Sequence, residues 1–183
     1  MSFWTNKKVL VTGGRGFIGS HLVDRLLTEG ATVRIVDLGS RSDPRRVAPE
    51  FPARAEYNEA DLCDPQSWNK VCRGADVVMH LAAKIRGVGY NVKHHGEMFF
   101  SNALINLHML EAARLAGVDR FLSVSTVGVY PKDCAVPTRE EDGFKGEPEA
   151  SGYGRISDLH STTPRHDRLR CRTAQGNRKD YDG

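Results

Sequence analysis

The chain lacks the cysteine spacings that build metal sites and disulfide frameworks. Its 183 residues include four cysteines, and none of them forms a CxxC pair or another metal-ligand spacing: Cys63, Cys72, Cys134 and Cys171. We therefore expect reduced thiols and no metal site. No apolar run approaches the ~20 residues that span a bilayer, and the N-terminus shows no apolar core of a secretory signal. These absences give no reason to expect a membrane partner and favour a cytoplasmic location.

Most of the chain also lacks an excess of charge. The formal net charge is +3, and it comes from residues 154–183, which hold seven Lys or Arg against four Asp. Residues 1–153 are neutral overall, so nothing in them indicates a nucleic-acid partner. Residues 154–183 contain only six apolar side chains and no helical or strand period. We expect a basic, poorly ordered tail there.

A glycine-rich turn follows the first apolar run, residues 8–12. Gly13, Gly16 and Gly19 have the spacing GxxGxxG and open a helical pattern. Such a turn aims backbone N–H groups and the positive helix end at an anion. Glycine is needed where the chain turns tightly and where a pyrophosphate approaches the backbone. The pattern predicts a cradle for the pyrophosphate of a dinucleotide that includes Phe17 and Ile18, with an ordinary strand-to-helix turn as the alternative.

Strand and helix patterns alternate along the rest of the chain. The strands are expected at residues 8–12, 32–37, 55–61, 76–82 and 120–125, and the main helices at 20–29, from 65 onward, and 97–116. This alternation predicts an α/β fold with a parallel sheet and right-handed crossovers. The strands are almost continuously apolar, which is typical of a sheet covered on both faces.

Local patterns also predict helix boundaries and buried faces. Asp64 followed by Pro65 marks the N-cap and first position of the short helix, and Gly117 ends the long one. The buried stripes are expected at Ile18, Leu22 and Leu26 in the first helix, and at Phe99, Ala103, Leu107, Leu110 and Ala113 in the long helix.

Further motifs lie at strand ends and on the long helix: Asp37, Asp61-Leu62, His80-Leu81-Ala82-Ala83, Asn102, Ser125-Thr126 and Tyr153. With the glycine turn, they resemble the extended short-chain dehydrogenase/reductase family over residues 8–153, in its sugar-nucleotide epimerase/dehydratase branch. Residues 82–87 and 129–132 are similar to GDP-sugar enzymes of that branch. The resemblance implies a Rossmann-type doubly wound NAD-binding domain in residues 1–153, a nucleotide-sugar substrate and a homodimer as one assembly.

The acidic residue Asp37 bears on the choice of cofactor. It ends the second expected strand, where a carboxylate accepts hydrogen bonds from ribose hydroxyls and repels a 2′-phosphate, so NAD is favoured over NADP. Arg41 lies nearby in sequence and could hold that phosphate, which keeps NADP as the alternative.

Five further residues are cofactor candidates by the resemblance. Asp61 and Leu62 resemble the pair that contacts adenine, and Ala82 and Ala83 allow close approach of the nicotinamide ribose. Lys84 is expected to face the same cleft. Each has a structural alternative: a solvated strand-end aspartate, simple tight packing, or a solvated lysine.

Asn102, Ser125, Thr126 and Tyr153 are the expected active-site residues. By the resemblance, Asn102 orients water or backbone, although a helix-surface asparagine is the alternative. Thr126 aligns best with the family's catalytic hydroxyl, with Ser125 beside it, and Tyr153 matches its base.

The family's lysine, four residues after the tyrosine, is replaced by Ser157. An unassisted phenol keeps a pKa near ~10 and is rarely ionised at neutral pH. We therefore expect little or no turnover from this chain.

Two departures narrow the reaction. The related 3,5-epimerases use a cysteine where Gly128 stands, and the related dehydratases carry an acidic pair where Val127 and Gly128 follow Thr126. An epimerase or reductase that transiently oxidises the sugar C4 therefore fits better.

The family continues into a smaller sugar-binding domain, which residues 154–183 do not resemble. A truncated product, a frame-shifted product and a domain fragment are all compatible with this. A non-catalytic dinucleotide-binding module and a non-functional fragment are therefore the alternative functions.

Overall fold

The computed structural model describes residues 2–39, 55–86, 90, 93–131 and 133–145. The expected base Tyr153, the expected tail 154–183 and Arg41 lie outside these residues. Within the described ranges, no helix combines the length and apolar character needed to cross a bilayer.

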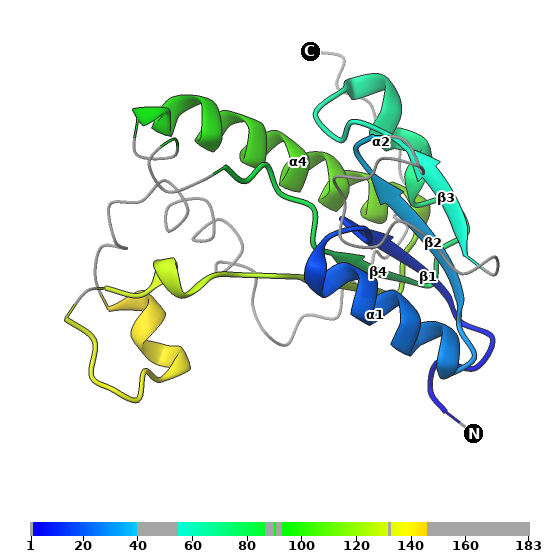
Figure 1. Ribbon diagram of the computed structural model, residues 1–183, viewed down its shortest axis with the longest axis horizontal. Coiled ribbons are helices and arrows are strands. Elements are labelled where there is room, and N and C mark those ends of the chain that lie inside the picture. Colours follow the sequence, from blue (N-terminus) through cyan, green and yellow to red (C-terminus); the bar gives the residue numbers. More distant parts are fainter. Residues whose placement is uncertain (1, 40–54, 87–89, 91–92, 132, 146–183) are drawn as a thin grey trace, which may run out of the picture.

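A parallel sheet forms the centre of the molecule (Figure 1). Five strands pair in the order β3-β2-β1-β4-β5, and all four pairings are parallel. Their bounds are Lys8–Thr12 (β1), Thr32–Asp37 (β2), Glu56–Glu59 (β3), Val77–His80 (β4) and Arg120–Ser123 (β5). The predicted Rossmann-type α/β fold is confirmed.

The first two strands have the predicted bounds, whereas β3, β4 and β5 are shorter than expected. After the end of β4, the Thr12 hydroxyl accepts hydrogen bonds from the N–H groups of Leu81 and Ala82, and the Thr12 carbonyl accepts a further one from Leu81. These contacts hold the chain that follows His80 beside the end of β1.

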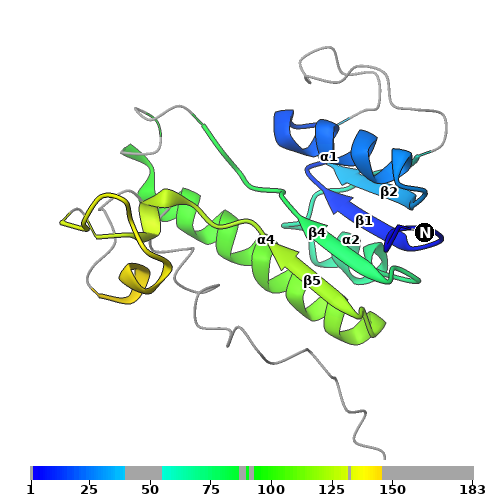
Figure 2. The same ribbon diagram turned by 90° about the horizontal axis from the view of Figure 1, so that it is seen from below.

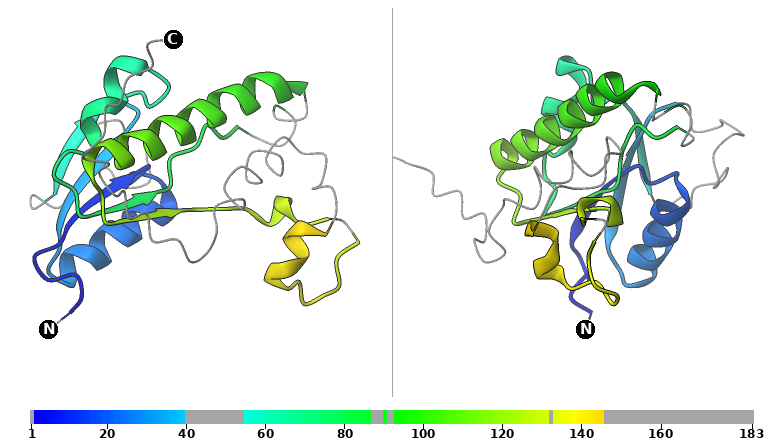
Figure 3. Two further views of the ribbon diagram at one scale, coloured as in Figure 1. Left: turned by 180° about the vertical axis from the view of Figure 1, so that it is seen from behind. Right: turned by 90° about the vertical axis from the view of Figure 1, so that its left-hand side faces the viewer.

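The helices lie on both faces of this sheet. Helix α1 (Phe17–Thr28) covers one face, and α2 (Pro65–Val71) and α4 (His95–Ala116) cover the other (Figure 3). Alternate strand residues face the two layers, so that Val9 and Val11 pack with the α1 side and Leu10 and Val78 with the α4 side. Burial on both faces explains why β1 and β4 read as nearly continuous apolar runs, whereas the edge strand β3 is polar and not buried.

After β5 the chain runs away from the sheet. It forms two short 3-10 helices, η1 (Val127–Val129) and η2 (Glu140–Phe144), which lie beyond the strand ends (Figure 2).

The chain reverses direction across the sheet between β3 and β4. Strands β2 and β3 lie on one side of β1, and β4 and β5 lie on its other side. In open α/β sheets, ligands bind at the carboxyl ends of the two strands that flank this switch point. Here those ends are Thr12 of β1 and His80 of β4, which are register partners.

The predicted buried face of the long helix is right only in part. Phe99 is 43% exposed and Leu107 56% exposed, Ala103 and Leu110 are half-buried, and Ala113 is buried as predicted. The buried residues of this helix are Met98, Ser101, Asn102, Ile105, Met109, Ala112 and Ala113. Apolar residues lie on more than one side of the helix, so the apolar pattern alone does not fix which side is buried.

Helix α1 differs from the prediction in a smaller way. Leu26 is buried and Leu22 is half-buried against the same apolar cluster, but Ile18 is 64% exposed. Val23 and Leu27 complete the buried stripe in its place.

Three cysteines fall within the described residues, and all three are free thiols: Cys63, Cys72 and Cys134. Burial raises the pKa of the Cys72 thiol to about 12, so this side chain behaves as a small core residue.

The predicted cap of the short helix is confirmed and can be tested. Asp64 Oδ1 accepts a hydrogen bond from the N–H of Gln66 at 2.9 Å, and Pro65 occupies the first helical position. The replacement Asp64→Ala is expected to lower the free energy of unfolding by about 1 kcal/mol, measured by urea denaturation. Asp64→Asn keeps the acceptor and is expected to lose much less. Equal losses in the two variants would contradict the capping role.

Candidate functional site

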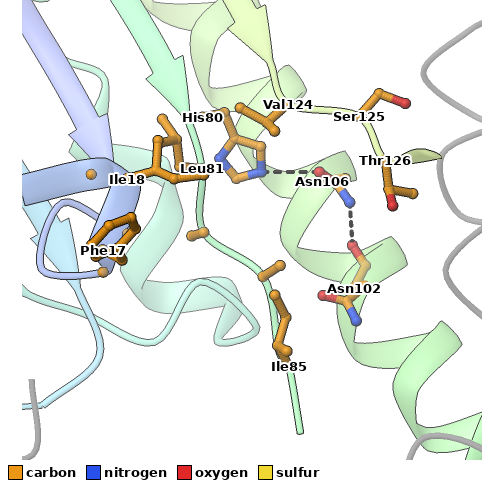
Figure 4. A pocket seen from close by; sticks show the side chains of 15 residues that line it. Phe17, Ile18, His80, Leu81, Ile85, Asn102, Asn106, Val124, Ser125 and Thr126 are labelled. Atoms are coloured by element: carbon orange, nitrogen blue, oxygen red, sulfur yellow. Dashed lines mark hydrogen bonds between the residues drawn. The ribbon is translucent and has the colours of Figure 1, made fainter. Parts of the chain in front are cut away.

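A pocket of about 490 Å³ opens at the switch point. Figure 4 shows side chains from α1, α4 and the ends of β4 and β5 around it. It is lined by Gly13, Gly16, Phe17, Ile18, Gly19, His80, Leu81, Ala82, Ala83, Ile85, Asn102, Asn106, Val124, Ser125 and Thr126. A mostly apolar concavity with a few polar groups is the usual form of a small-molecule site.

The glycine turn forms one wall of this pocket. Gly13 has φ +68°, and a Cβ there would lie 2.9 Å from the backbone nitrogen of Ala82. A Cβ at Gly19 would overlap the carbonyl oxygen of Gly13. Only glycine therefore allows β1, α1 and the end of β4 to approach this closely.

Gly16 has a different role from the other two glycines. A Cβ at this position would meet only the Gly13 carbonyl oxygen, at 3.3 Å, which is a tight contact but a milder one than those at Gly13 and Gly19. Because Gly16 lines the pocket, its bare backbone leaves room for a ligand to approach. This division of roles fits a bound diphosphate.

The first turn of α1 points its N–H groups toward the same wall. Gly16 is the N-cap, with no side-chain hydrogen bond to the helix, and the first turn contains no acidic residue. The positive end of the helix is therefore not compensated by a side chain of this turn, as an anion site requires. Phe17 and Ile18 are mostly exposed and form the apolar rim.

Asp37 lies behind the glycine turn rather than in the pocket lining. Its Oδ2 accepts a hydrogen bond from the N–H of Arg15 at 2.9 Å, and its Oδ1 accepts one from Leu38 at 2.8 Å. The carboxylate is only 6% exposed.

Arg15 is a residue that the sequence analysis missed. It is fully buried, with its guanidinium carbon 6.0 Å from the centroid of the Tyr57 ring. Burial raises the pKa of the Tyr57 hydroxyl, which donates a hydrogen bond to the Gly39 carbonyl. Arg15 occupies a variable position of GxxGxxG, and the spacing itself gives no sign of this environment.

The pair Asp61-Leu62 is not brought to the pocket. Asp61 is exposed, and its Oδ1 accepts a hydrogen bond from the N–H of Cys63. Leu62 is 5% exposed within the apolar core, and its carbonyl lies 2.8 Å from Nδ1 of His108.

The segment after β4 forms a second wall. Ala82 and Ala83 line it, as predicted for residues that permit close approach. Lys84 is not among the lining residues, because its ammonium binds Glu97 Oε1 at 2.8 Å and Ser101 Oγ at 3.3 Å. The hydrogen bond to Glu97 raises the pKa of Lys84.

Asn102 is buried, which differs from the surface asparagine considered as its alternative. Its Oδ1 accepts a hydrogen bond from the N–H of Lys84 at 2.8 Å, and its Nδ2 donates to the Lys84 carbonyl at 3.0 Å. The side chain therefore orients the backbone of Lys84.

Ser125 and Thr126 reach the pocket from the end of β5 (Figure 4). Thr126 Oγ1 accepts a hydrogen bond from the N–H of Gly128 at 3.3 Å, which leaves its hydroxyl proton for donation. Among the residues that the structure covers, no group of three or more His, Cys, Asp or Glu is placed to hold a metal ion.

A glycine turn and a helix N-terminus lie together at the switch point of a parallel sheet, which is the arrangement of a Rossmann-type α/β domain. Over residues 9–156 the chain matches the NAD dependent epimerase/dehydratase family, and it belongs to that family.

The similar proteins are longer sugar-nucleotide enzymes. GDP-mannose 3,5-epimerase 1 of Oryza sativa subsp. japonica is 33% identical over 158 residues, which cover 83% of this chain and 40% of the relative. The UDP-glucose 4-epimerase of Thermotoga maritima, solved with UDP-glucose, has TM-score 0.70 and 30% identity, covering 83% of this chain and 48% of the other. The Thermus thermophilus UDP-glucose 4-epimerase, solved with NAD, has TM-score 0.68 and 30% identity over 84% and 48%. The chain thus spans less than half the length of these proteins.

The different roles of Gly19 and Gly16 give a paired prediction. Gly19→Ala is expected to lower the free energy of unfolding by about 2 kcal/mol, because its Cβ meets backbone that must shift. Gly16→Ser keeps a good N-cap and is expected to cost less than about 1 kcal/mol, but to weaken NAD binding at least tenfold by projecting into the pocket. Urea denaturation and calorimetric titration measure the two effects. Equal destabilisation, or unchanged NAD affinity in Gly16→Ser, would overturn the assignment.

Proposed function

We propose that this chain is the dinucleotide-binding part of an NAD-dependent sugar-nucleotide epimerase or reductase. The observation that carries the proposal is the glycine turn. Backbone packs too closely on Gly13 and Gly19 to admit a Cβ, and the backbone of Gly16 lines the pocket at the switch point. The NAD-bound relative from Thermus thermophilus supports the choice of cofactor.

The residues around the pocket suggest how NAD would be held. The backbone of Gly16, Phe17 and Ile18 would receive the diphosphate at the positive end of α1. The Asp37 carboxylate, fixed from behind by Arg15 and Leu38, would accept the adenosine ribose hydroxyls. Ala82 and Ala83 would allow the nicotinamide ribose to approach the backbone.

The adenine contact proposed for Asp61 and Leu62 rests on the exposed Asp61 carboxylate, which could accept from the amino group of adenine. The Leu62 side chain is committed to the apolar core and is not free to cover the base.

When bound, NAD would accept a hydride from the sugar C4 and return it. The Thr126 hydroxyl would hold the sugar O4, Ser125 would offer a second hydroxyl beside it, and Tyr153 would take the O4 proton. The nucleotide-sugar substrate is supported by the relative solved with UDP-glucose.

Chemistry at C4 is proposed in preference to 3,5-epimerisation, although the rice relative carries that name. Gly128 occupies the position of the cysteine that the related 3,5-epimerases use, and glycine has no side chain to move a proton.

The second candidate is a dinucleotide-binding module without catalysis. Ser157 favours it, because the hydroxyl that replaces the lysine supplies no cation to stabilise a Tyr153 phenolate. We therefore propose NAD binding with little or no turnover by this chain itself.

Thermal unfolding in the presence of NAD tests both candidates. At a hundredfold excess over Kd, NAD is expected to stabilise the folded state by about 2.7 kcal/mol and to raise Tm by several degrees. The same preparation is assayed with UDP- and GDP-hexoses, for which we expect no epimerisation. Turnover comparable to that of a longer relative would refute the second candidate, a dinucleotide-binding module without catalysis. If NAD does not raise Tm, both candidates are rejected and a non-functional fragment is the remaining interpretation.

The cofactor preference can be tested at Asp37. Asp37→Asn is expected to weaken NAD binding about tenfold and to narrow the ratio of NADP to NAD dissociation constants, because the charge that repels a 2′-phosphate is removed. Glu59→Gln removes the same charge from the adjacent strand and is the matched control. The ratio is read by calorimetry and does not depend on the folded fraction. An unchanged ratio would show that Asp37 does not meet the ribose.

A further inference from the structure

Three adjacent strands end on polar side chains beneath α4. Thr12, His80 and Ser123 are register partners on β1, β4 and β5. Two residues earlier, the same strand face carries apolar core residues: Leu10, Val78 and Phe121. The apolar layer under α4 is thus replaced by a polar row at the strand ends, and His80 of this row lines the pocket.

The hydrogen bonds around His80 assign its tautomer. Asn106 Nδ2 donates to the Asn102 carbonyl at 2.8 Å, so Asn106 Oδ1 faces His80 Nε2 at 3.0 Å. An amide oxygen only accepts, and therefore Nε2 carries the proton. The other nitrogen, Nδ1, lies 2.7 Å from the Thr12 hydroxyl and accepts from it.

Thr12 completes this arrangement at the sheet. Its oxygen accepts the N–H groups of Leu81 at 3.2 Å and Ala82 at 3.1 Å, while its proton goes to His80. Each donor in the chain of contacts from Ala82 to Asn106 therefore meets an acceptor when the imidazole is neutral and protonated at Nε2.

Asn102 of α4 also binds the backbone of the segment after β4. It binds both the N–H and the carbonyl of Lys84, as a neighbouring strand would. Residues 81–86 belong to no strand or helix, so side chains of β1 and α4 hold their backbone. Figure 4 shows the connected contacts from His80 through Asn106 to Asn102.

We propose that His80 is a positioning residue for the dinucleotide site. Its Nε2–H holds Asn106 and thereby fixes α4 against β4, so that Thr12 and Asn102 present Ala82–Lys84 as a rigid wall. The ligand of this wall is the NAD of the proposed function, on which the inference rests. His80 acts through Asn106 and Thr12.

A purely structural histidine would make a different prediction. Its removal would lower global stability and would loosen all elements alike. A positioning role predicts a selective effect, in which the Lys84 amide loses protection while the amide of Val78, inside β4, keeps it.

The test combines hydrogen exchange of single amides with NAD titration. In Asn106→Leu and His80→Leu, exchange of the Lys84 amide relative to that of Val78 is expected to accelerate at least tenfold, and the NAD dissociation constant to rise about tenfold. His80→Gln keeps one donor and one acceptor, so it is expected to retain most of the Lys84 amide protection and most of the NAD affinity. Val71→Ala, in the same apolar cluster under α4, is the control for general core destabilisation and should leave the exchange ratio and the NAD dissociation constant unchanged.

A second measurement uses the unmodified chain and does not depend on how the variants fold. Long-range ¹H–¹⁵N correlation is expected to show His80 as the Nε2–H tautomer. An Nδ1–H tautomer would overturn the inference, as would unchanged Lys84 protection and NAD affinity in Asn106→Leu. If the unmodified chain binds no NAD, the proposed function fails, while the tautomer and the exchange ratio still decide whether His80 holds the wall.

Discussion

The close approach of the glycine turn to the end of β4 is the constraint on which the site depends. A Cβ at Gly13 would collide with the Ala82 backbone, and one at Gly19 would collide with Gly13. Because these side chains are missing, β1, α1 and the chain after β4 meet at one point. The positive end of α1 and the small residues after β4 therefore face one concavity. The pocket is a consequence of backbone packing, and the backbone of Gly16 lines it.

Side-chain hydrogen bonds hold the segment after β4, which belongs to no strand or helix. The segment after β4 has no strand partner, and its N–H groups are bound by Thr12 and Asn102. These polar groups are buried, so each must be satisfied at some cost in apolar packing. Polar side chains thus replace apolar ones under α4 at the place where they hold the wall of the pocket in position. Binding sites commonly place order in this way, on a rigid scaffold beside irregular backbone.

The proposed function separates ligand binding from catalysis. The described residues contain the features that a dinucleotide needs, and the hydroxyls of Ser125 and Thr126 lie in the same pocket. Membership of the NAD dependent epimerase/dehydratase family places these features in a known context. Under the proposed function, the serine at position 157 would affect proton transfer, because diphosphate binding requires no lysine at that position. A protein of this kind can retain its ligand while its reaction is impaired.

The sequence by itself determined the order of strands and helices, the glycine turn, the Asp64 cap and the position of the strand-end residues Asp37, Ser125 and Thr126. These features depend on local periodicity and turn chemistry, which neighbouring residues encode. Only the tertiary structure decided that α4 buries Asn102 rather than Phe99 and Leu107, that Leu62 belongs to the core, and that Lys84 pairs with Glu97. It also joined His80 to Asn106, 26 residues away. Such contacts depend on which face the sheet presents to the helix, and that is fixed only when distant segments pack together.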